Sequence, residues 1–539
     1  MFMNRFFLIL WALFLTMSVQ AQFVNYGATI TIQPGATLRI ETSFENQAGT
    51  IDNQGTLEVL GNFTNAAGAG TTLSGNGTVK FIGDANSNVI TNGDALQNVE
   101  MAKTAQNITL QDPMTINGTL TFTSDNNKII LGSNDLTIGA SGSIVSYDDN
   151  EYVVTGGTGR LVKTDLGTTA FTYPVGFDAS TYNPVNIAEN GTVDNIAVRV
   201  LQHAYVNGTS GTAITTNIVD ATWSITDAVA GGNNLSITPS WIGTDEVSFD
   251  RSQCRVVRYN GSKYDLDLAT KGAATAPSPY SRQRTGITNI GNFIVSSSSF
   301  VKVAPKVFLE GAYVTAEPTN AKMRDALRSN NKLPLAQPFG QLTFTGTYAA
   351  SLVSDDAVSQ TVFDVTGENA VVDWVLLELR DNNTRSIVHA RRAALLQRDG
   401  DVVDTDGTSP VRFDNITDGN YHLSVRHRVH LGTRTLNSLA LSETSTPINF
   451  TNNANALANS QKELGSVGSG VFGLFTGDVD RDGRTLSGDI LAIGAFINTN
   501  LSSFNYFTRS RDCDLDGRIL SGDIVLSGTN INKNINLNQ

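Results

Sequence analysis

Cysteine is almost absent from this chain of 539 residues, which contains only Cys254 and Cys513. Two cysteines cannot form the disulfide framework that holds small secreted domains together. They fall in different expected domains, Cys254 on a strand and Cys513 inside an acidic loop. We therefore expect both thiols to be unpaired, with a bridge between them as the alternative.

Charged side chains are also scarce, at 16% of the chain against about 25% in typical soluble proteins. Lys and Glu are too few for a heptad protein. The net charge of −13 argues against a nucleic-acid partner, because proteins that bind phosphate backbones are usually basic. Disorder is excluded as well, since Val, Ile, Leu and Phe recur throughout the chain.

Long apolar runs are missing after the first 21 residues, so we expect no transmembrane segment in the mature chain. Residues 1–21 have the pattern of a secretory signal peptide. Asn4 and Arg5 precede an apolar stretch at 6–17, and small residues at 19–21 offer a cleavage site. We expect an exported protein that is secreted or located at the cell surface.

Short units that begin with glycine repeat between residues 22 and 146. They start at Gly35, Gly55, Gly77 and Gly118, in steps of 20, 22 and 41 residues, and apolar and polar positions alternate after each glycine. A period near 20 with short strands is typical of a solenoid, in which stacked coils share one core. We predict a parallel β-solenoid of about six coils, with a flat sandwich as the alternative.

The repeat stops near residue 147, but strand patterns continue. Residues 254–259 form one such pattern, and Asn260-Gly261 after them is a hairpin signal. We expect a β-sandwich over residues 147–300.

A second sandwich, of immunoglobulin-like type, is expected over residues 301–450. Its clearest strands are 373–380 and 421–427, and 320–329 is the one segment with a helical tendency. The polar stretch 451–470 is predicted to be a linker. It would lead to a small calcium-loop module at 471–539, so the whole chain is predicted to be a multi-domain all-β protein.

Two acidic segments in that module, 478–490 and 512–524, agree at ten of thirteen positions. Each has Asp at loop positions 1, 3, 5 and 12 and Gly at position 6, the spacing of an EF-hand-type calcium loop. Ca²⁺ takes six to eight oxygen ligands, which alternate carboxylates and the position-7 carbonyl supply. The predicted Ca²⁺ ligands are Asp478, Asp480, Asp482, Arg484 (carbonyl) and Asp489, and Asp512, Asp514, Asp516, Arg518 (carbonyl) and Asp523.

The two acidic segments lead into different stretches of chain. The first leads into an apolar run at 490–497 that predicts a short helix, whereas the helix after the second is expected to be short or absent. The alternative to calcium binding is a pair of solvated acidic turns. A divalent cation would remove the repulsion between so many neighbouring carboxylates.

Three other groups of residues are candidate sites. A cluster of acidic residues at 399–406 contains two Asp-Gly pairs, which favours hairpin turns over a metal site. His427 and His430 are three apart on an expected strand, so we expect them to face opposite sides and not to form a metal pair. Core packing is favoured over sugar stacking for the tryptophans Trp223, Trp241 and Trp374.

Catalytic motifs are lacking: there is no Gly-x-Ser-x-Gly elbow, phosphate loop or His-Glu-x-x-His sequence. We therefore do not expect an enzyme. A carboxylate pair for glycoside hydrolysis cannot be picked out from sequence alone, because the chain contains 50 acidic residues.

The repeated acidic segments resemble dockerin-type calcium repeats, which bind cohesin domains in bacterial extracellular complexes. This resemblance implies calcium ligation by the eight aspartates and a cohesin-like partner. The rest of the chain resembles haemagglutinin-like surface proteins of Gram-negative bacteria, on the stretches 172–176 with 182–185, 371–380, and 394–401 with 425–428. It implies a surface or extracellular location and supplies no catalytic residue.

These observations predict an exported, calcium-binding, adhesin-like or assembly protein with a protein or glycan partner. One alternative is an accessory or catalytic component of extracellular polysaccharide degradation, because solenoids can host lyases and hydrolases. The other is a structural filament subunit that self-associates.

Overall fold

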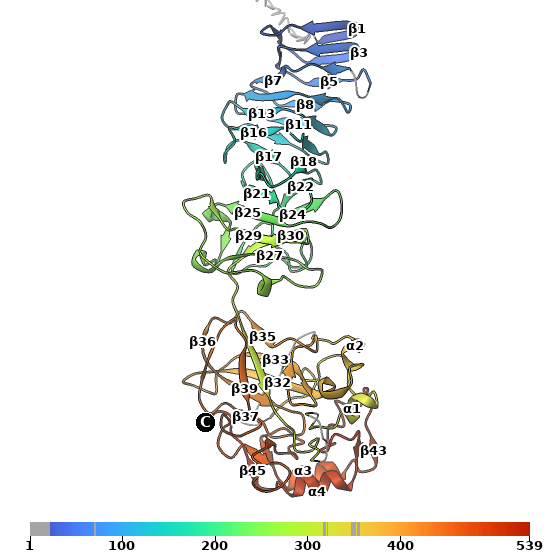
Figure 1. Ribbon diagram of the computed structural model, residues 1–539, viewed down its shortest axis with the longest axis vertical. Coiled ribbons are helices and arrows are strands. Elements are labelled where there is room, and N and C mark those ends of the chain that lie inside the picture. The colour runs from blue at the N-terminus through green and yellow to red at the C-terminus, as the bar shows by residue number, and fades with distance from the viewer. Residues whose placement is uncertain (1–21, 69–71, 316–319, 321, 346–351, 353–355) are drawn as a thin grey trace, which may run out of the picture. The chain divides into compact units, whose positions relative to one another are not determined.

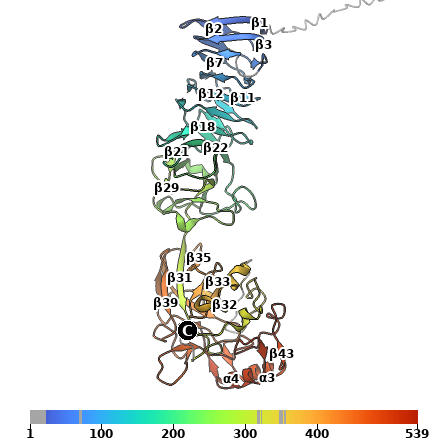
Figure 2. The same ribbon diagram turned by 45° about the vertical axis from the view of Figure 1, so that its right-hand side comes forward.

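The computed structural model describes residues 22–68, 72–315, 320, 322–345, 352 and 356–539 (Figure 1). The expected signal peptide at 1–21 lies outside the described residues. The chain divides into two compact units, Met1–Ser298 and Ser299–Gln539. Strands dominate both units and the helices are short, so the predicted all-β class is confirmed (Figure 2). No helix within the described ranges is long and apolar enough to cross a membrane.

The N-terminal unit begins with the predicted parallel β-solenoid, built from three ladders of parallel strands. The first ladder contains β1 (Phe23–Ile32), β3 (Phe44–Asn53), β5 (Phe63–Asn65), β8 (Ser87–Ile90), β11 (Ile108–Leu110), β14 (Lys128–Ile130), β17 (Tyr152–Val154) and β20 (Val175–Gly176). The second contains β2 (Thr37–Ile40), β4 (Thr56–Val59), β7 (Thr78–Gly83), β10 (Asn98–Lys103), β13 (Thr119–Phe122) and β16 (Ser143–Val145). The third contains β9 (Ala95–Leu96), β12 (Met114–Ile116), β15 (Leu136–Ile138) and β18 (Leu161–Leu166).

The solenoid extends beyond the predicted limit at residue 146, since β17 and β20 continue the first ladder. β18 pairs in parallel with β15 on one side and antiparallel with β22 (Asp194–Leu201) on the other. One sheet therefore passes from the solenoid into the following antiparallel domain. This continuation covers the last strand of the solenoid, which would otherwise expose an unpaired edge.

The antiparallel domain consists of two sheets that share the core of the solenoid. The first sheet continues from β22 through β24 (Thr222–Asp227), β30 (Gly291–Ser296), β27 (Arg255–Arg258), β23 (Ile218–Val219) and β26 (Glu246–Val247). The second contains β19 (Phe171–Tyr173), β21 (Val185–Glu189), β25 (Leu235–Trp241), β28 (Tyr280–Ser281) and β29 (Arg284–Ile287).

The C-terminal unit also packs two sheets, one antiparallel and one mixed, around a core. One contains β34 (Val402–Val403), β33 (Val388–Gln397), β32 (Val371–Asp381), β36 (Gly419–Arg426), β37 (Thr433–Arg434) and β38 (Leu439–Leu441). The other contains β35 (Val411–Asp414), β31 (Phe300–Lys306) and β39 (Thr446–Asn449), with β39 parallel to β31. Of the segment with a helical tendency, only α1 (Ala326–Ser329) is helical, and α2 (Gln360–Phe363) lies elsewhere in the unit.

The predicted linker at 451–470 is instead part of the folded unit. β40 (Gln461–Glu463) pairs with β41 (Phe472–Leu474), and Ala456 and Leu464 are buried. A single core runs from Val301 to Leu537 and includes apolar residues of the acidic segments. The segment 471–539 therefore shares the core of the sandwich and does not form a separate one.

Identical residues stack from coil to coil inside the solenoid. The side-chain amide of Asn25 donates to Asn46 at 2.8 Å, and that of Asn46 donates to Asn65 at 3.0 Å. Phe44 stacks on Phe23 and Phe63, with ring centroids 6.0 and 5.1 Å away. Each buried amide thus finds its partner only when neighbouring coils are in register, so the asparagine ladder specifies that register.

The asparagine ladder generates a stability prediction. Asn46→Ala removes the two buried hydrogen bonds that Asn46 makes with Asn25 and Asn65, so we expect the free energy of unfolding to fall by about 1–3 kcal/mol. Urea unfolding of the mature chain, residues 22–539, measures this change. The control is Gln47→Ala, because Gln47 is exposed. Equal stability of both variants would contradict a structural role for the ladder.

Candidate metal centre

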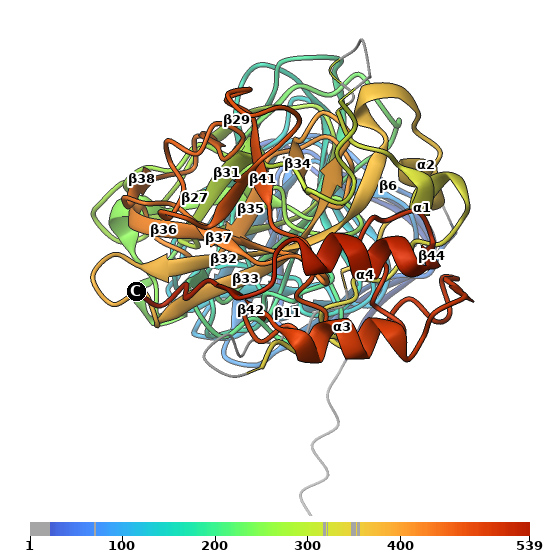
Figure 3. The same ribbon diagram turned by 90° about the horizontal axis from the view of Figure 1, so that it is seen from below.

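The acidic segments form two loops of the same shape, which we name loop 1 (residues 478–489) and loop 2 (residues 512–523). Each passes through a two-residue strand, β42 (Arg484–Thr485) or β44 (Arg518–Ile519), into a helix. The helices α3 (Ser487–Gly494) and α4 (Ser521–Gly528) each have eight residues and lie side by side (Figure 3). The expectation that the second helix is short or absent is therefore wrong, because Ser-Gly-Asp-Ile starts both helices.

The carboxylates of each loop converge. In loop 1, Asp478, Asp480 and Asp489 each place an oxygen within 4.8 Å of the others. In loop 2, the converging group is Asp512, Asp514 and Asp516, so its third member comes from position 5 of the loop and not from position 12. Asp482 lies outside the first group and Asp523 outside the second. Such all-oxygen donor sets fit hard cations such as Ca²⁺.

Backbone amides hold the first and last aspartate of each loop. Asp478 accepts N–H groups from Asp482 and Gly483 at 3.1 and 3.2 Å, and Asp512 accepts the matching amides at 3.2 and 2.9 Å. Asp489 accepts from Val479 at 2.9 Å and Leu486 at 2.8 Å. Asp523 repeats these bonds in loop 2. The last carboxylate therefore ties the start of each loop to the following helix.

The turn in each loop requires left-handed backbone at two positions. The position-6 glycines have φ of 88° at Gly483 and 91° at Gly517. The position-4 residues Arg481 and Leu515 also have positive φ, 62° and 58°. Glycine is the residue that adopts this conformation without a steric cost, which explains its place in the repeat.

Burial and mutual repulsion perturb the loop carboxylates. Burial, followed by the charges of neighbouring aspartates, raises the pKa of Asp478 well above its usual range. Burial likewise raises the pKa of Asp512, although Arg428 opposes that shift. The pKa of Asp523 is raised to about 6, chiefly by burial. A bound divalent cation would stabilise the ionised carboxylates, so the electrostatics of the loops also fit such an ion.

The side chains of the acidic cluster at 399–406 are engaged in turns and ion pairs. Asp399 and Asp401 lie at a turn, where Lys306 pairs with Asp401 at 3.0 Å. Asp404 pairs with Arg392 at 2.7 Å, and Asp406 accepts the Thr408 and Ser409 amides at the next turn. The acidic cluster at 399–406 therefore forms turns, as the sequence favoured.

The prediction that His427 and His430 face opposite sides is wrong. Strand β36 ends at Arg426, so the alternation does not extend to these residues, and their Nδ1 atoms lie 2.9 Å apart. Both rings are fully buried. The Gly311 amide donates to His430 Nε2 at 3.3 Å, which leaves His430 Nδ1–H to donate to His427 Nδ1. His427 Nε2–H then donates to Asp373 at 3.1 Å. These nitrogens are committed to hydrogen bonds.

Asp373, on β32, is the centre of a buried cluster that no local sequence pattern predicts. It accepts from Arg428 Nε at 2.9 Å, from His427 and from the hydroxyl of Tyr506. Burial raises the pKa of Asp373, but the charge of Arg428 and the bonds from His427 and Tyr506 lower it to about 2. Tyr506 lies between the two loops in sequence, so the cluster joins the sandwich to the segment between them.

The remaining candidates are structural. Trp223, Trp241 and Trp374 are fully buried, as expected for core residues. Cys254 and Cys513 are unpaired and buried, in separate units, which confirms the expectation of free thiols.

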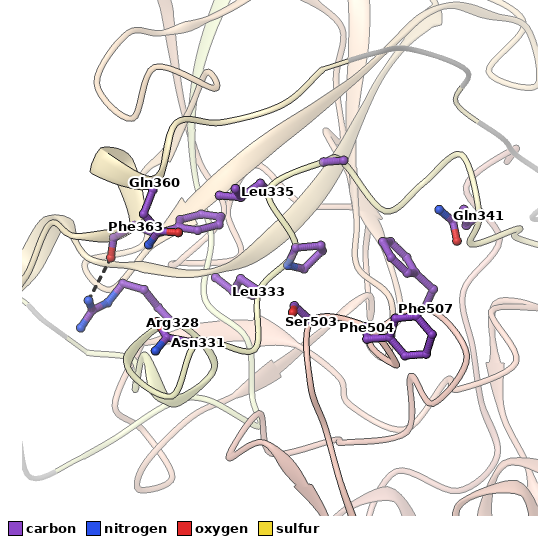
Figure 4. A pocket seen from close by; sticks show the side chains of 12 residues that line it. Arg328, Asn331, Leu333, Leu335, Gln341, Gln360, Phe363, Ser503, Phe504 and Phe507 are labelled. Atoms are coloured by element: carbon purple, nitrogen blue, oxygen red, sulfur yellow. Dashed lines mark hydrogen bonds between the residues drawn. The ribbon is translucent and has the colours of Figure 1, made fainter.

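A cavity of about 780 Å³ opens beside α1 and α2 (Figure 4). Phe504 at its rim is 93% exposed. Its charged lining residue, Arg328, is bound to Asp325 and to the Phe363 carbonyl. The described residues that line it include no carboxylate, histidine or cysteine, so among them there is no carboxyl pair of the kind used in glycoside hydrolysis.

Comparison with known proteins gives little. No family model and no curated protein matches the chain. One solved chain, from a type II cohesin–X–dockerin complex of Acetivibrio cellulolyticus, shares 15% identity and covers 30% of this chain and 81% of its own length. Its TM-score of 0.18 is too low to indicate a common fold.

The first prediction from this site concerns pH. Asp523 has a folded-state pKa of about 6, above the usual value of about 3.9. The folded state therefore favours the protonated carboxyl of Asp523. The stability that depends on this proton is fully present below about pH 4 and is lost as the pH rises through 6. We expect the melting temperature of the calcium-free mature chain to fall between pH 5 and pH 7. Asp523→Asn should reduce this slope, and a melting temperature that rises with pH would contradict the prediction.

The second prediction concerns the buried cluster. Asp373→Asn removes the charge that pairs with the buried Arg428, and breaking such a pair costs about 3–5 kcal/mol. Urea unfolding followed by tryptophan fluorescence measures this loss. Asp364→Asn is the control, because Asp364 is exposed in the same unit. A loss below about 1 kcal/mol, the scale of a surface pair, would show that the cluster does not support the fold.

Proposed function

We propose that this protein is exported, binds Ca²⁺ through loops 1 and 2, and acts in calcium-dependent adhesion or assembly at the cell surface or in the surrounding medium. The observation that carries the proposal is the duplicated group of converging, partly buried carboxylates. The positive charge of Ca²⁺ would neutralise these carboxylates, and the Arg484 and Arg518 carbonyls at position 7 would add ligands.

Calcium would stabilise the C-terminal unit. β42 of loop 1 pairs with β45 (Lys533–Asn534), and β44 of loop 2 pairs with β43 (Thr499–Asn500). Thr476, just before loop 1, donates to the Cys513 carbonyl of loop 2 at 2.9 Å. Holding both loops therefore holds the C-terminal segment against the sandwich, so ion binding would be coupled to the stability of the whole unit.

The remainder of the chain supports a binding role more than a catalytic one. A solenoid provides a long, regular surface, and sandwiches present loops to partners. The signal pattern at 1–21 supports export to the cell exterior, where Ca²⁺ would be available even to weak sites. The partner would be a protein or a glycan, with a cohesin-like domain and a second copy of the chain among the candidates.

The calcium proposal is tested by calorimetric titration of residues 22–539 with Ca²⁺. We expect heat of binding in the native chain and a higher melting temperature. Ca²⁺ at one hundred times the dissociation constant adds about 2.7 kcal/mol of stability for each occupied site. The double variant Asp480→Asn/Asp514→Asn should lose both effects, because each change removes a central ligand.

The matched control is Asp364→Asn/Asp414→Asn, which removes two exposed carboxylates of the same unit. It should bind Ca²⁺ like the native chain. Absence of heat and of a thermal shift in the native chain would rule out calcium binding. Calcium-dependent attachment is then measured by the retention of coated beads on bacterial cells and glycan surfaces, where the double variant should lose retention.

A further inference from the structure

The two loops share one sequence pattern but receive different charges from the rest of the C-terminal unit. In loop 2, Arg428 Nη2 lies 4.0 Å from an Asp512 carboxylate oxygen, and Arg324 Nη1 lies 3.8 Å from Asp514. Both arginines belong to the part of the unit that precedes the loops. Two of the predicted calcium ligands of loop 2 therefore already face a cation.

Loop 1 has no ion pair of this kind in the described part of the unit, although the charge of Arg481, within the loop itself, acts on Asp478 and Asp480. Among the residues that the structure describes, no Lys, Arg or His forms an ion pair with any carboxylate of loop 1. Arg481 lies within the loop, but its guanidinium donates to the carbonyls of Thr343 and Val479, at 3.0 and 2.9 Å. Its donors are thus directed to backbone oxygens and not to the ligand carboxylates.

Arg428 is held firmly in its position beside loop 2. It is fully buried, its Nε donates to Asp373 at 2.9 Å, and its guanidinium lies 4.7 Å from the ring centre of Tyr506. Its Nη2 atom is buried and has no hydrogen-bond partner in the described chain. That nitrogen faces Asp512, so a permanent positive charge lies beside the first ligand position of loop 2.

We propose that the loops have diverged in function, with loop 1 a tight calcium site and loop 2 a weak one that Arg428 and Arg324 partly neutralise. This inference rests on the calcium binding proposed above. The arginines repel an incoming cation and stabilise the ionised carboxylates in its absence. Loop 2 therefore keeps its shape without calcium, whereas the shape of loop 1 depends on the ion.

The test separates the two sites in the mature chain. Asp514→Asn disables loop 2, so the titration of this variant measures Ca²⁺ binding to loop 1. Asp480→Asn disables loop 1, so its titration measures binding to loop 2. In calorimetric Ca²⁺ titrations we expect the dissociation constant of loop 2 to exceed that of loop 1 by roughly tenfold or more, as expected for cations close to the ion in a medium of low dielectric constant.

A second change identifies the cause. Arg324→Gln, made in the Asp480→Asn chain, should tighten loop 2 by roughly threefold to tenfold, because it removes a partly screened cation. The Arg324 side chain is 41% exposed, so this variant should fold, unlike one at the buried Arg428. Arg509→Gln is the control, since it makes the same charge change at an exposed arginine of the unit.

The outcomes distinguish this inference from the proposed function. A weak loop 2 that Arg324→Gln tightens, and that Arg509→Gln leaves unchanged, supports the divergence of the loops. Equal affinities, a tighter loop 2, or no effect of Arg324→Gln would overturn the divergence and leave calcium binding standing. No binding at either loop would overturn the proposed function and the divergence with it.

Discussion

The buried ion pair between Asp373 and Arg428 holds the C-terminal unit together. Both residues are fully buried, and isolated charges in such a position would be strongly unfavourable. They are stable because His427 and Tyr506 complete the hydrogen bonds of Asp373. The cluster thereby brings β32, the turn after β36 and the segment between the two loops to one point. The position of loop 2 follows from this cluster.

A related constraint shapes the N-terminal unit, where a stack of parallel coils must end without exposing strand edges. Here the sheet of β18 continues into antiparallel pairing with β22. The solenoid and the following sandwich therefore share one core. Inside the coils, asparagine and phenylalanine ladders fix the register, so the repeat of the sequence becomes a repeat of contacts.

The two acidic loops show how one sequence motif acquires two environments. Loops 1 and 2 match in their turns, helices and amide bonds to Asp489 and Asp523. Within the described part of the unit, only loop 2 forms ion pairs with arginines from outside the motif. The divergence that we propose therefore depends on charges supplied by the sandwich. The adhesion or assembly role that we propose would depend in turn on calcium binding to this unit.

Local patterns in the sequence were sufficient for the all-β class, the solenoid and the two acidic loops. Alternation and a period near 20 residues report strands that stack, and Asp and Gly spacing reports a loop, because each effect acts over a few residues. The chain alone also placed the tryptophans in the core. The tertiary structure decided what depends on distant partners: the end of the solenoid at β20, the folded state of 451–470, the contact of His427 with His430, and the arginines beside Asp512 and Asp514. Packing and buried charge join residues that are far apart in sequence, and no local sequence pattern predicts which of these residues will be in contact.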